Sequence, residues 1–289
     1  MAEHKDIDEL SGTVTTGHEW DGIKELNTPL PRWWLWTLYV TIIWGIGYMI
    51  AMPAIPYITG YTKGILGHSQ RAVVAEDVAA TAAARAEQAA QLEGASLDQV
   101  RSDPDLYNFA IAGGRSAFAV NCAQCHGTGG GGAPGYPNLL DDDWLWGGGV
   151  DQIMLTVRYG IRSGHDEARV NDMPRFGTDG ILTGAEIRQV AAYVQKLAGV
   201  EHDAEAAVAG TELYVDNCVA CHGEDGKGNM ELGAPNLTDN IWLYGGDLGS
   251  IVASISRPQN AVMPNWDDRL DPVTIKQLAI YVHSLSGGE

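Results

Sequence analysis

Apolar and polar residues follow several patterns along this chain of 289 residues, and the first is one long uncharged run. Residues 1–32 are mostly polar and acidic, whereas residues 33–52 are almost wholly apolar. Twenty helical residues span about 30 Å, the thickness of a hydrocarbon core. The run therefore predicts one transmembrane helix, which we place at residues 33–58, with Pro53 and Pro56 marking where a regular helix stops or kinks.

The alternative interpretation of this run is a cleaved signal peptide. A signal peptide has a shorter apolar region that lies closer to the N-terminus, so we favour an uncleaved anchor in contact with membrane lipid. Aromatic residues at both ends of the run are typical of the interface between lipid and water. They are Trp33, Trp34 and Trp36 at one end and Tyr57 and Tyr61 at the other.

After the anchor comes a stretch with high helix propensity and little to bury. Residues 71–102 are rich in Ala, carry charges of both signs and contain only a few scattered aliphatic side chains. This composition predicts an exposed helix that acts as a spacer rather than as a domain. We place it in a linker over residues 59–102.

The rest of the chain repeats itself. The sequence AFAVNCAQCHG at residues 117–127 returns, 96 positions later, as LYVDNCVACHG at residues 213–223. Shorter matches follow in the same order: Pro-Asn-Leu at 137–139 and 235–237, Trp-Leu-Trp/Tyr-Gly-Gly at 144–148 and 242–246, and Met-Pro at 173–174 and 263–264. Two copies of one fold are therefore predicted, as domains over residues 103–199 and 200–289.

Each copy closes with an amphipathic helix. Apolar residues recur at offsets 0, 3, 4, 7 and 10, on one helical face: Ile187, Val190, Ala191, Val194 and Leu197 in the first copy and Ile275, Leu278, Ala279, Val282 and Leu285 in the second. Thr183 with Glu186 predicts a capping box, and Asp271 with Pro272 predicts the start of the second helix. The expected fold class is mainly α, with one N-terminal transmembrane helix followed by two tandem domains.

The charge balance excludes one class of partner. The chain has 37 acidic and 18 basic side chains, a formal charge of −19, whereas binding to nucleic acid needs a basic surface. More than half of this charge, a net −10, lies in residues 200–289. A negative surface attracts a basic partner and speeds their encounter at low salt. Acidity that serves solubility alone is the alternative.

All four cysteines lie in two C-x-x-C-H motifs inside the repeat. The motif residues are Cys122, Cys125 and His126 in the first copy and Cys218, Cys221 and His222 in the second. This is the attachment signature of c-type haem, in which two thiols bond to the haem vinyl groups and the adjacent His is an axial iron ligand. A redox dithiol does not require the His, and in a zinc ribbon both C-x-x-C pairs share one metal. Two motifs in register favour two covalently bound haem c groups.

The sixth iron ligand is expected downstream of each motif. Met is typical of an electron carrier because thioether ligation raises the reduction potential. Met173 and Met263 are the candidates, since both precede Pro and lie 47 and 41 residues after their histidines. Met154 and Met230 are interpreted as a core and a loop residue. By default each Met binds the haem of its own domain, but a crossed arrangement between the domains is also compatible with the sequence.

Two covalent haem c groups, each ligated by His and Met, have two consequences. With no open iron position, the haems are expected to transfer electrons and to catalyse no reaction of their own. Haem c is attached outside the cytoplasm, so the residues after Tyr57 are expected in the periplasm and residues 1–32 in the cytoplasm. The chain is then a single-pass protein of a bacterial inner membrane.

The order of these features resembles the dihaem subunit of cbb3-type cytochrome c oxidase, known as CcoP or FixP. The resemblance covers essentially the whole chain: an acidic N-terminus, one anchor, a spacer and two class I cytochrome c domains. NTPLPRWWLW at residues 27–36 and Trp-Leu-Trp/Tyr-Gly-Gly after each haem motif make it specific. The N-terminal run through the anchor is similar to purple-bacterial members in particular.

This resemblance implies partners that the motifs alone do not. The subunit would take electrons from a soluble or membrane-bound cytochrome c. It would pass them to a monohaem cytochrome subunit and then to the catalytic haem-copper subunit, which reduces oxygen and pumps protons. We hypothesise that electrons enter through the acidic second domain. A free-standing dihaem cytochrome, the cytochrome subunit of a periplasmic dehydrogenase and a dihaem peroxidase are the alternatives.

Overall fold

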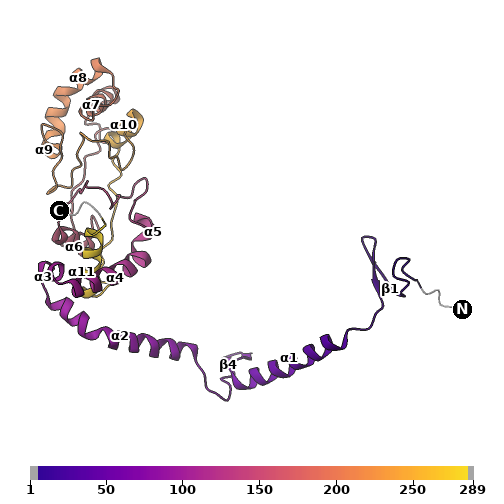
Figure 1. Cartoon of the computed structure of the whole chain (residues 1–289). Coiled ribbons are helices and arrows are strands. Elements are labelled where there is room, and N and C mark those ends of the chain that lie inside the picture. The colour runs from indigo at the N-terminus through magenta and orange to yellow at the C-terminus, as the bar shows by residue number, and fades with distance from the viewer. Residues whose placement is uncertain (1–5, 286–289) are drawn as a thin grey trace. The chain divides into compact units, whose positions relative to one another are not determined.

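The first structured element is a β-hairpin that the sequence analysis did not anticipate. Strands β1 (Thr15–Trp20) and β2 (Ile23–Leu26) pair antiparallel on either side of Asp21 and Gly22, whose φ angles are +48° and +84°. Asp-Gly suits a two-residue hairpin turn because both central residues need positive φ. The computed structural model describes residues 6–285, in two compact units, Met1–Ala83 and Ala84–Glu289 (Figure 1). Residues 1–5 of the expected N-terminal segment and 286–289 of the expected second domain lie outside the described residues.

Helix α1 (Arg32–Ala51) is the expected membrane helix. It has 20 residues, is long and apolar enough to cross a membrane, and buries none of its side chains within the protein. Its exposed apolar surface suits contact with lipid. The helix ends at Ala51, short of residue 58, because Met52 is extended and Pro53 follows it.

The chain folds back on the end of α1. The two-residue strands β3 (Pro56–Tyr57) and β4 (Gly60–Tyr61) pair antiparallel. Gly64 has a φ of +69°, and a Cβ at this position would lie 2.3 Å from the carbonyl oxygen of Ala51. The Leu66 N–H then donates to that carbonyl at 3.1 Å, so the returning chain satisfies an acceptor at the end of the helix.

The Ala-rich stretch forms helix α2 (Gln70–Gly94), followed by α3 (Leu97–Ser102). Most of α2 is exposed, as a spacer would be, but Leu92 is completely buried and so is Val100 of α3. The structure therefore differs from the expected exposed spacer at its C-terminal end. There the helix contributes to the core of the second compact unit.

Eight helices build the repeat region as far as residue 285, where the described residues end. The first repeat forms α4 (Pro104–Asn121), α5 (Ala123–His126), α6 (Val150–Tyr159) and α7 (Gly184–Leu197). The second forms α8 (Ala204–Asn217), α9 (Val219–His222), α10 (Leu248–Ser256) and α11 (Pro272–His283). Both closing helices begin at the expected caps and bury most of the expected apolar face. The last expected positions differ: Leu197 is only half-buried, and α11 ends at His283, two residues before the half-buried Leu285.

The closing helices are exchanged between the repeats. Helix α11 packs against α4 and α6 of the first repeat, whereas α7 packs against α8 and α10 of the second (Figure 1). We call α4, α5, α6 and α11 the first packing unit, and α7 to α10 the second packing unit. Each has its own buried apolar cluster, so each of the two cores contains residues from both repeats.

Glycines at matched positions allow the two helix pairs to cross closely. A Cβ on Gly114 of α4 would lie 2.2 Å from the backbone oxygen of Gln277 in α11. A Cβ on Gly210 of α8 would lie 2.1 Å from the backbone oxygen of Gln189 in α7. Glycine weakens a helix interior by about 1 kcal/mol, and here close packing of two helices offsets that loss.

The connection between the repeats is short, which accounts for the exchange. Only residues 198–203 separate the end of α7 from the start of α8. A connection of this length favours antiparallel packing of the two helices it joins. Because the repeats carry similar helices, α11 can then complete the first packing unit.

Lys276 of α11 fastens the end of the spacer to the first packing unit. Its Nζ donates to the carbonyl oxygens of Leu92, Glu93 and Ala95 at 2.9, 2.9 and 2.8 Å. These carbonyls lie at the C-terminus of α2, where a cation is favourable. Burial lowers the pKa of Lys276, while the charge of Glu93 opposes this shift.

Candidate functional site

Each C-x-x-C-H motif forms one turn of helix directly after the first long helix of its repeat. Cys122 separates α4 from α5, and Cys218 separates α8 from α9. The preceding residues, Asn121 and Asn217, each donate a side-chain N–H to the carbonyl oxygen four residues earlier, at 2.9 Å. The cysteines of both motifs are thus presented by the same local geometry.

The histidine that ends each motif has a fixed ring orientation. Nδ1 of His126 lies 3.0 Å from the carbonyl oxygen of Pro137, and Nδ1 of His222 lies 3.1 Å from the carbonyl oxygen of Pro235. Because a carbonyl only accepts, Nδ1 carries the proton and Nε2 keeps a lone pair for a metal. Burial lowers the pKa of both histidines, although the bond to the carbonyl opposes the shift. The repeated Pro-Asn-Leu therefore has a structural role in orienting the histidine ring.

The cysteine chemistry argues against the two alternative interpretations of the motifs. Burial, with a smaller contribution from the second cysteine, raises the pKa of Cys122 and of Cys218 to about 11. A redox dithiol needs a lowered thiol pKa. The two motifs also belong to separate clusters, and within residues 6–285 no three His, Cys, Asp or Glu side chains are grouped to hold a metal ion. A shared zinc site is therefore disfavoured.

Met263 of the second repeat lies with the first motif. It packs against the core of the first packing unit, as do Cys122 and Trp144. Its backbone N–H and carbonyl form two hydrogen bonds with those of Ile161, both of 3.0 Å. A Cβ on Gly160 would lie 2.4 Å from the Met263 carbonyl oxygen. The Met263 loop, residues 261–268, is thus docked on the segment that follows α6.

Met173 of the first repeat lies with the second motif. It packs against the core of the second packing unit, as does Cys218. The Met173 loop, residues 170–178, docks on the end of α10, where Ser256 accepts the backbone N–H of Gly177 at 3.2 Å. The packing of the two methionines is therefore crossed between the repeats, a question that the sequence left open.

The other two methionines of the repeat region, Met154 and Met230, lie in a core and in a loop, as expected from the sequence around them. Met154 of α6 packs against the core of the first packing unit, so it is a core residue. Met230 lies in a loop of the second repeat, and 49% of its surface is exposed. Met173 and Met263 thus combine a loop position with packing on the core that a motif cysteine also joins.

The repeated Trp-Leu-Trp/Tyr-Gly-Gly brings an indole ring against each core. Trp144 packs on the first cluster and Trp242 on the second. A Cβ on Gly148 would lie 2.6 Å from Cδ1 of Trp144, and one on Gly246 would lie 2.5 Å from Nε1 of Trp242. The second glycine of the signature is therefore required by the close approach of the ring.

The residues that brace the Met263 loop belong to no motif in the sequence. The ring of His165, in the segment after α6, stacks on Tyr159 at a centroid distance of 4.9 Å. Its Nδ1 accepts the backbone N–H of Glu167 at 3.0 Å, which leaves the proton on Nε2. Nε2 lies 3.1 Å from Oδ2 of Asp267, so the ring ties the segment after α6 to the Met263 loop.

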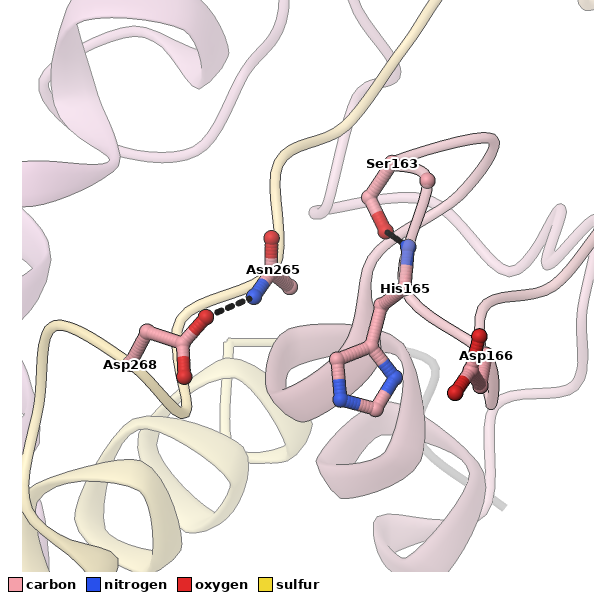
Figure 2. A pocket seen from close by; sticks show the side chains of 6 residues that line it. Ser163, His165, Asp166, Asn265 and Asp268 are labelled. Atoms are coloured by element: carbon pink, nitrogen blue, oxygen red, sulfur yellow. Dashed lines mark hydrogen bonds between the residues drawn. The ribbon is translucent and has the colours of Figure 1, made fainter.

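The same two segments border an open polar pocket, which Figure 2 shows from close by. Its lining comprises Ser163, Gly164, His165 and Asp166 on one side and Asn265 and Asp268 on the other. The only sequence signal for this segment was a difference in length, because 47 residues separate His from Met in the first repeat and 41 in the second.

Two acidic loops from different repeats also meet. Burial raises the pKa of Asp143 to about 6, and the charges of Asp239 and Asp141 add to the shift. Asp239 comes from the second repeat, and the hydrogen bond from the Gly135 N–H to the Leu243 carbonyl, 2.8 Å, joins the same two loops. No motif in the sequence indicated this contact.

The donor set in each packing unit fits a c-type haem. Two free thiols, an imidazole with its Nε2 available and a methionine are the groups that such a haem requires. The fold and these sites define a class of protein: a cytochrome c with two tandem domains behind an N-terminal helix that can cross a membrane.

Comparison with known proteins gives the family. A model of cytochrome c oxidase, cbb3-type, subunit III matches residues 109–194 and 205–282, and a model of the N-terminal domain of cytochrome oxidase-cbb3, FixP, matches residues 12–59. The chain therefore belongs to the FixP/CcoP family of cbb3-type cytochrome c oxidase subunits.

Relatives named as subunits of cbb3-type oxidases match over nearly their whole length. The cbb3-type cytochrome c oxidase subunit FixP of Bradyrhizobium sp. (strain ORS 278) is 54% identical over 290 residues, covering 100% of both chains. Subunit CcoP of Cereibacter sphaeroides is 52% identical over 276 residues, covering 95% of both chains. Subunit FixP of Rhizobium meliloti is 50% identical over 99% of both.

Proposed function

We propose that the protein carries two covalently bound haem c groups and passes electrons through them to the oxygen-reducing subunit of a cbb3-type oxidase. The observation that carries this proposal is the presence, in each packing unit, of one C-x-x-C-H turn and one loop methionine against the same core. Membership of the oxidase subunit family supports the oxygen-reducing subunit as the electron acceptor.

The ligation follows the packing units rather than the repeats. Cys122 and Cys125 hold the first haem, with His126 and Met263 as its axial ligands. The second haem is held by Cys218 and Cys221, with axial ligands His222 and Met173. The packing of Met263 on the same core as Cys122, and of Met173 on the same core as Cys218, supports this crossed set.

Each haem supplies a one-electron carrier when it is bound. Because His and Met fill both axial positions, neither iron has an open site for oxygen or peroxide. The chain then has no active site of its own and serves the oxidase as an electron-transfer subunit. This property separates the proposal from a dihaem peroxidase.

The haem units lie in the periplasm and residues 1–32 in the cytoplasm. Haem c attachment takes place outside the cytoplasm, and α1 is long enough to be the single crossing between the two sides. The monohaem cytochrome subunit, the haem-copper subunit and a cytochrome c donor are the partners. The first two are neighbours within the complex.

Electrons enter through the second packing unit. Residues 162–256, which contain α7 to α10, have 15 acidic and 6 basic side chains, so the net charge of −9 stays with this unit after the exchange of helices. The charge of exposed positions just before the two haem motifs also differs. Glu212 and Asp216 of the second repeat are acidic, whereas the corresponding Ser116 and Val120 of the first repeat are uncharged. A basic donor would be steered to the acidic unit.

Gentle extraction in detergent tests the proposed function. If the chain belongs to an oxidase, it co-purifies with haem b and copper and contains two covalent haems by mass. A free-standing shuttle cytochrome would purify without haem b and copper. Carbon monoxide binding to the isolated ferrous subunit would contradict closed axial positions.

A matched pair of variants tests the haem count. Replacing both Cys125 and His126 with Ala should remove one covalent haem, and replacing both Cys221 and His222 with Ala should remove the other. The mass of the chain reports each loss. A chain that keeps two haems in either variant would contradict the attachment sites.

A further inference from the structure

Arg162 has an unusual backbone conformation at the point where the two repeats meet. Its φ is +51°, in the left-handed region that non-glycine residues rarely adopt. It follows Ile161, whose backbone pairs with that of Met263. A strained residue persists only where its surroundings hold it, and such residues concentrate at functional sites. The contacts of the Arg162 side chain are what hold this conformation in place.

The guanidinium of Arg162 binds the backbones of both methionine loops. Its Nε donates to the carbonyl oxygen of Ala261 at 2.8 Å, and its Nη1 donates to that of Asn171, also at 2.8 Å. Ala261 lies two residues before Met263, and Asn171 lies two residues before Met173. The side chain is only 23% exposed, so water competes little for these donors.

The tie through Arg162 differs from the other contacts of these loops. His165 braces the Met263 loop alone, through Asp267, on the wall of the pocket in Figure 2. Thr178 of the Met173 loop donates its N–H and its hydroxyl to the carbonyl oxygen of Ser256, which holds that loop on α10. Each of these contacts holds one loop, whereas the guanidinium spans both.

We propose that Arg162 is a shared positioning residue for the sixth ligands of the two haems, joining the Met173 loop to the Met263 loop so that both methionines are held together. This inference rests on the proposed ligation of the haems by Met173 and Met263. A substitution of Arg162 then alters the ligation of both irons, although the Arg162 side chain contacts neither iron.

The geometry of arginine suits this role. Its guanidinium is a rigid planar fork whose donors point in fixed directions, whereas lysine offers a single mobile ammonium. Arg162→Lys keeps the positive charge but cannot fix two carbonyls at the Nε and Nη1 positions. Arg162→Gln removes the charge as well. The pair of variants therefore separates positioning from simple electrostatics.

The experiment uses the full-length chain with both haems attached, purified in detergent. The red-edge charge-transfer band of ferric methionine-ligated haem reports the iron–sulfur bonds, and a spectroelectrochemical titration gives both midpoint potentials. Arg175→Gln is the matched control, because Arg175 is an exposed arginine two residues after Met173. His165→Leu is the comparison that perturbs one loop only. Mass spectrometry checks that two haems are attached in every variant.

We expect Arg162→Gln to weaken the band and lower the potentials of both haems, since loss of methionine ligation lowers the potential. Arg162→Lys should shift both in the same direction. His165→Leu should affect one haem, and Arg175→Gln should retain the full band. If Arg162→Gln does not attach both haems, the Lys variant decides the question.

Two results would overturn the inference. One is a change confined to a single haem in the Arg162 variants, and the other is an Arg162→Lys protein with the band and potentials of the wild type. The variants Met173→Ala and Met263→Ala separate this failure from that of the proposed ligation. Each should remove the band of one haem, and a variant with the full band would refute the ligand assignment itself.

Discussion

The close crossing of α7 and α8 makes Gly210 a sensitive position. A Cβ there would lie 2.1 Å from the backbone oxygen of Gln189, whereas ordinary contacts begin near 3.4 Å. Gly210→Ala must therefore push the two helix backbones apart by about 1.3 Å at the crossing. The obstacle is backbone, so no side-chain rotation can relieve it.

The size of the effect follows from two opposed contributions. Overpacking of this kind costs about 1–3 kcal/mol. Alanine in place of glycine strengthens the helix itself by up to about 1 kcal/mol. The expected result for Gly210→Ala is a decrease of about 1–2 kcal/mol in the free energy of unfolding.

A second glycine provides the control. Gly184, at the start of α7, has no heavy atom within 4 Å of the position of a Cβ. Gly184→Ala should therefore leave the free energy of unfolding unchanged or raise it by up to about 1 kcal/mol. Denaturant unfolding of the haem-loaded chain in detergent, followed by far-ultraviolet circular dichroism, compares the two variants. A Gly210→Ala protein as stable as Gly184→Ala would refute the close packing of α7 on α8.

Three further perturbations have expected outcomes. The pKa of Asp143 is raised to about 6 from 3.8, so the charge of this carboxylate destabilises the fold at pH 7. Asp143→Asn should therefore raise the free energy of unfolding by about 1 kcal/mol, after allowance for the partial exposure of the side chain. This gain should vanish below about pH 4, and a gain independent of pH would contradict the reasoning. Lys276→Met removes three hydrogen bonds to the end of α2 and should cost about 1–2 kcal/mol in chemical denaturation, whereas an unchanged midpoint would show that the tie is unimportant. Glu212→Lys with Asp216→Lys should slow electron transfer from a basic cytochrome c in stopped flow at low salt; equal rates at every ionic strength would exclude steering by these residues.

The helices of the repeat region could be predicted because their signals are local. The apolar stripe from Ile187 to Leu197 and the capping pair Thr183 and Glu186 each lie within one helix, and the structure confirms both. The turn of each haem motif is likewise encoded by a few adjacent residues. Local patterns of this kind require no knowledge of which element packs against which.

The pairing of helices is different, because the repeats offer each closing helix two similar partners. The periodicity of α11 fits α4 as well as α8, so no stripe of apolar residues distinguishes the two. The short connection over residues 198–203 was the available signal, since it favours packing of α7 on α8. The crossed position of the methionines follows from that single topological choice.

Two other features were present in the sequence as short signals. Asp21-Gly22 between apolar residues is a hairpin turn, and the structure has one there. Ser96 and Gln99 form a capping box that begins α3 within the stretch expected to be a spacer. The roles of Arg162 and His165 had no such signal, because their contacts join segments about 100 residues apart.

The origin of the sixth ligand of the first haem tests the crossed ligation most directly. A Cys218→Ser, Cys221→Ser chain keeps only the first haem, and either Met173→Ala or Met263→Ala can be added to it. The charge-transfer band of methionine-ligated ferric haem should persist with Met173→Ala and disappear with Met263→Ala. Loss of the band with Met173→Ala and its retention with Met263→Ala would contradict the exchange of ligands between the two repeats.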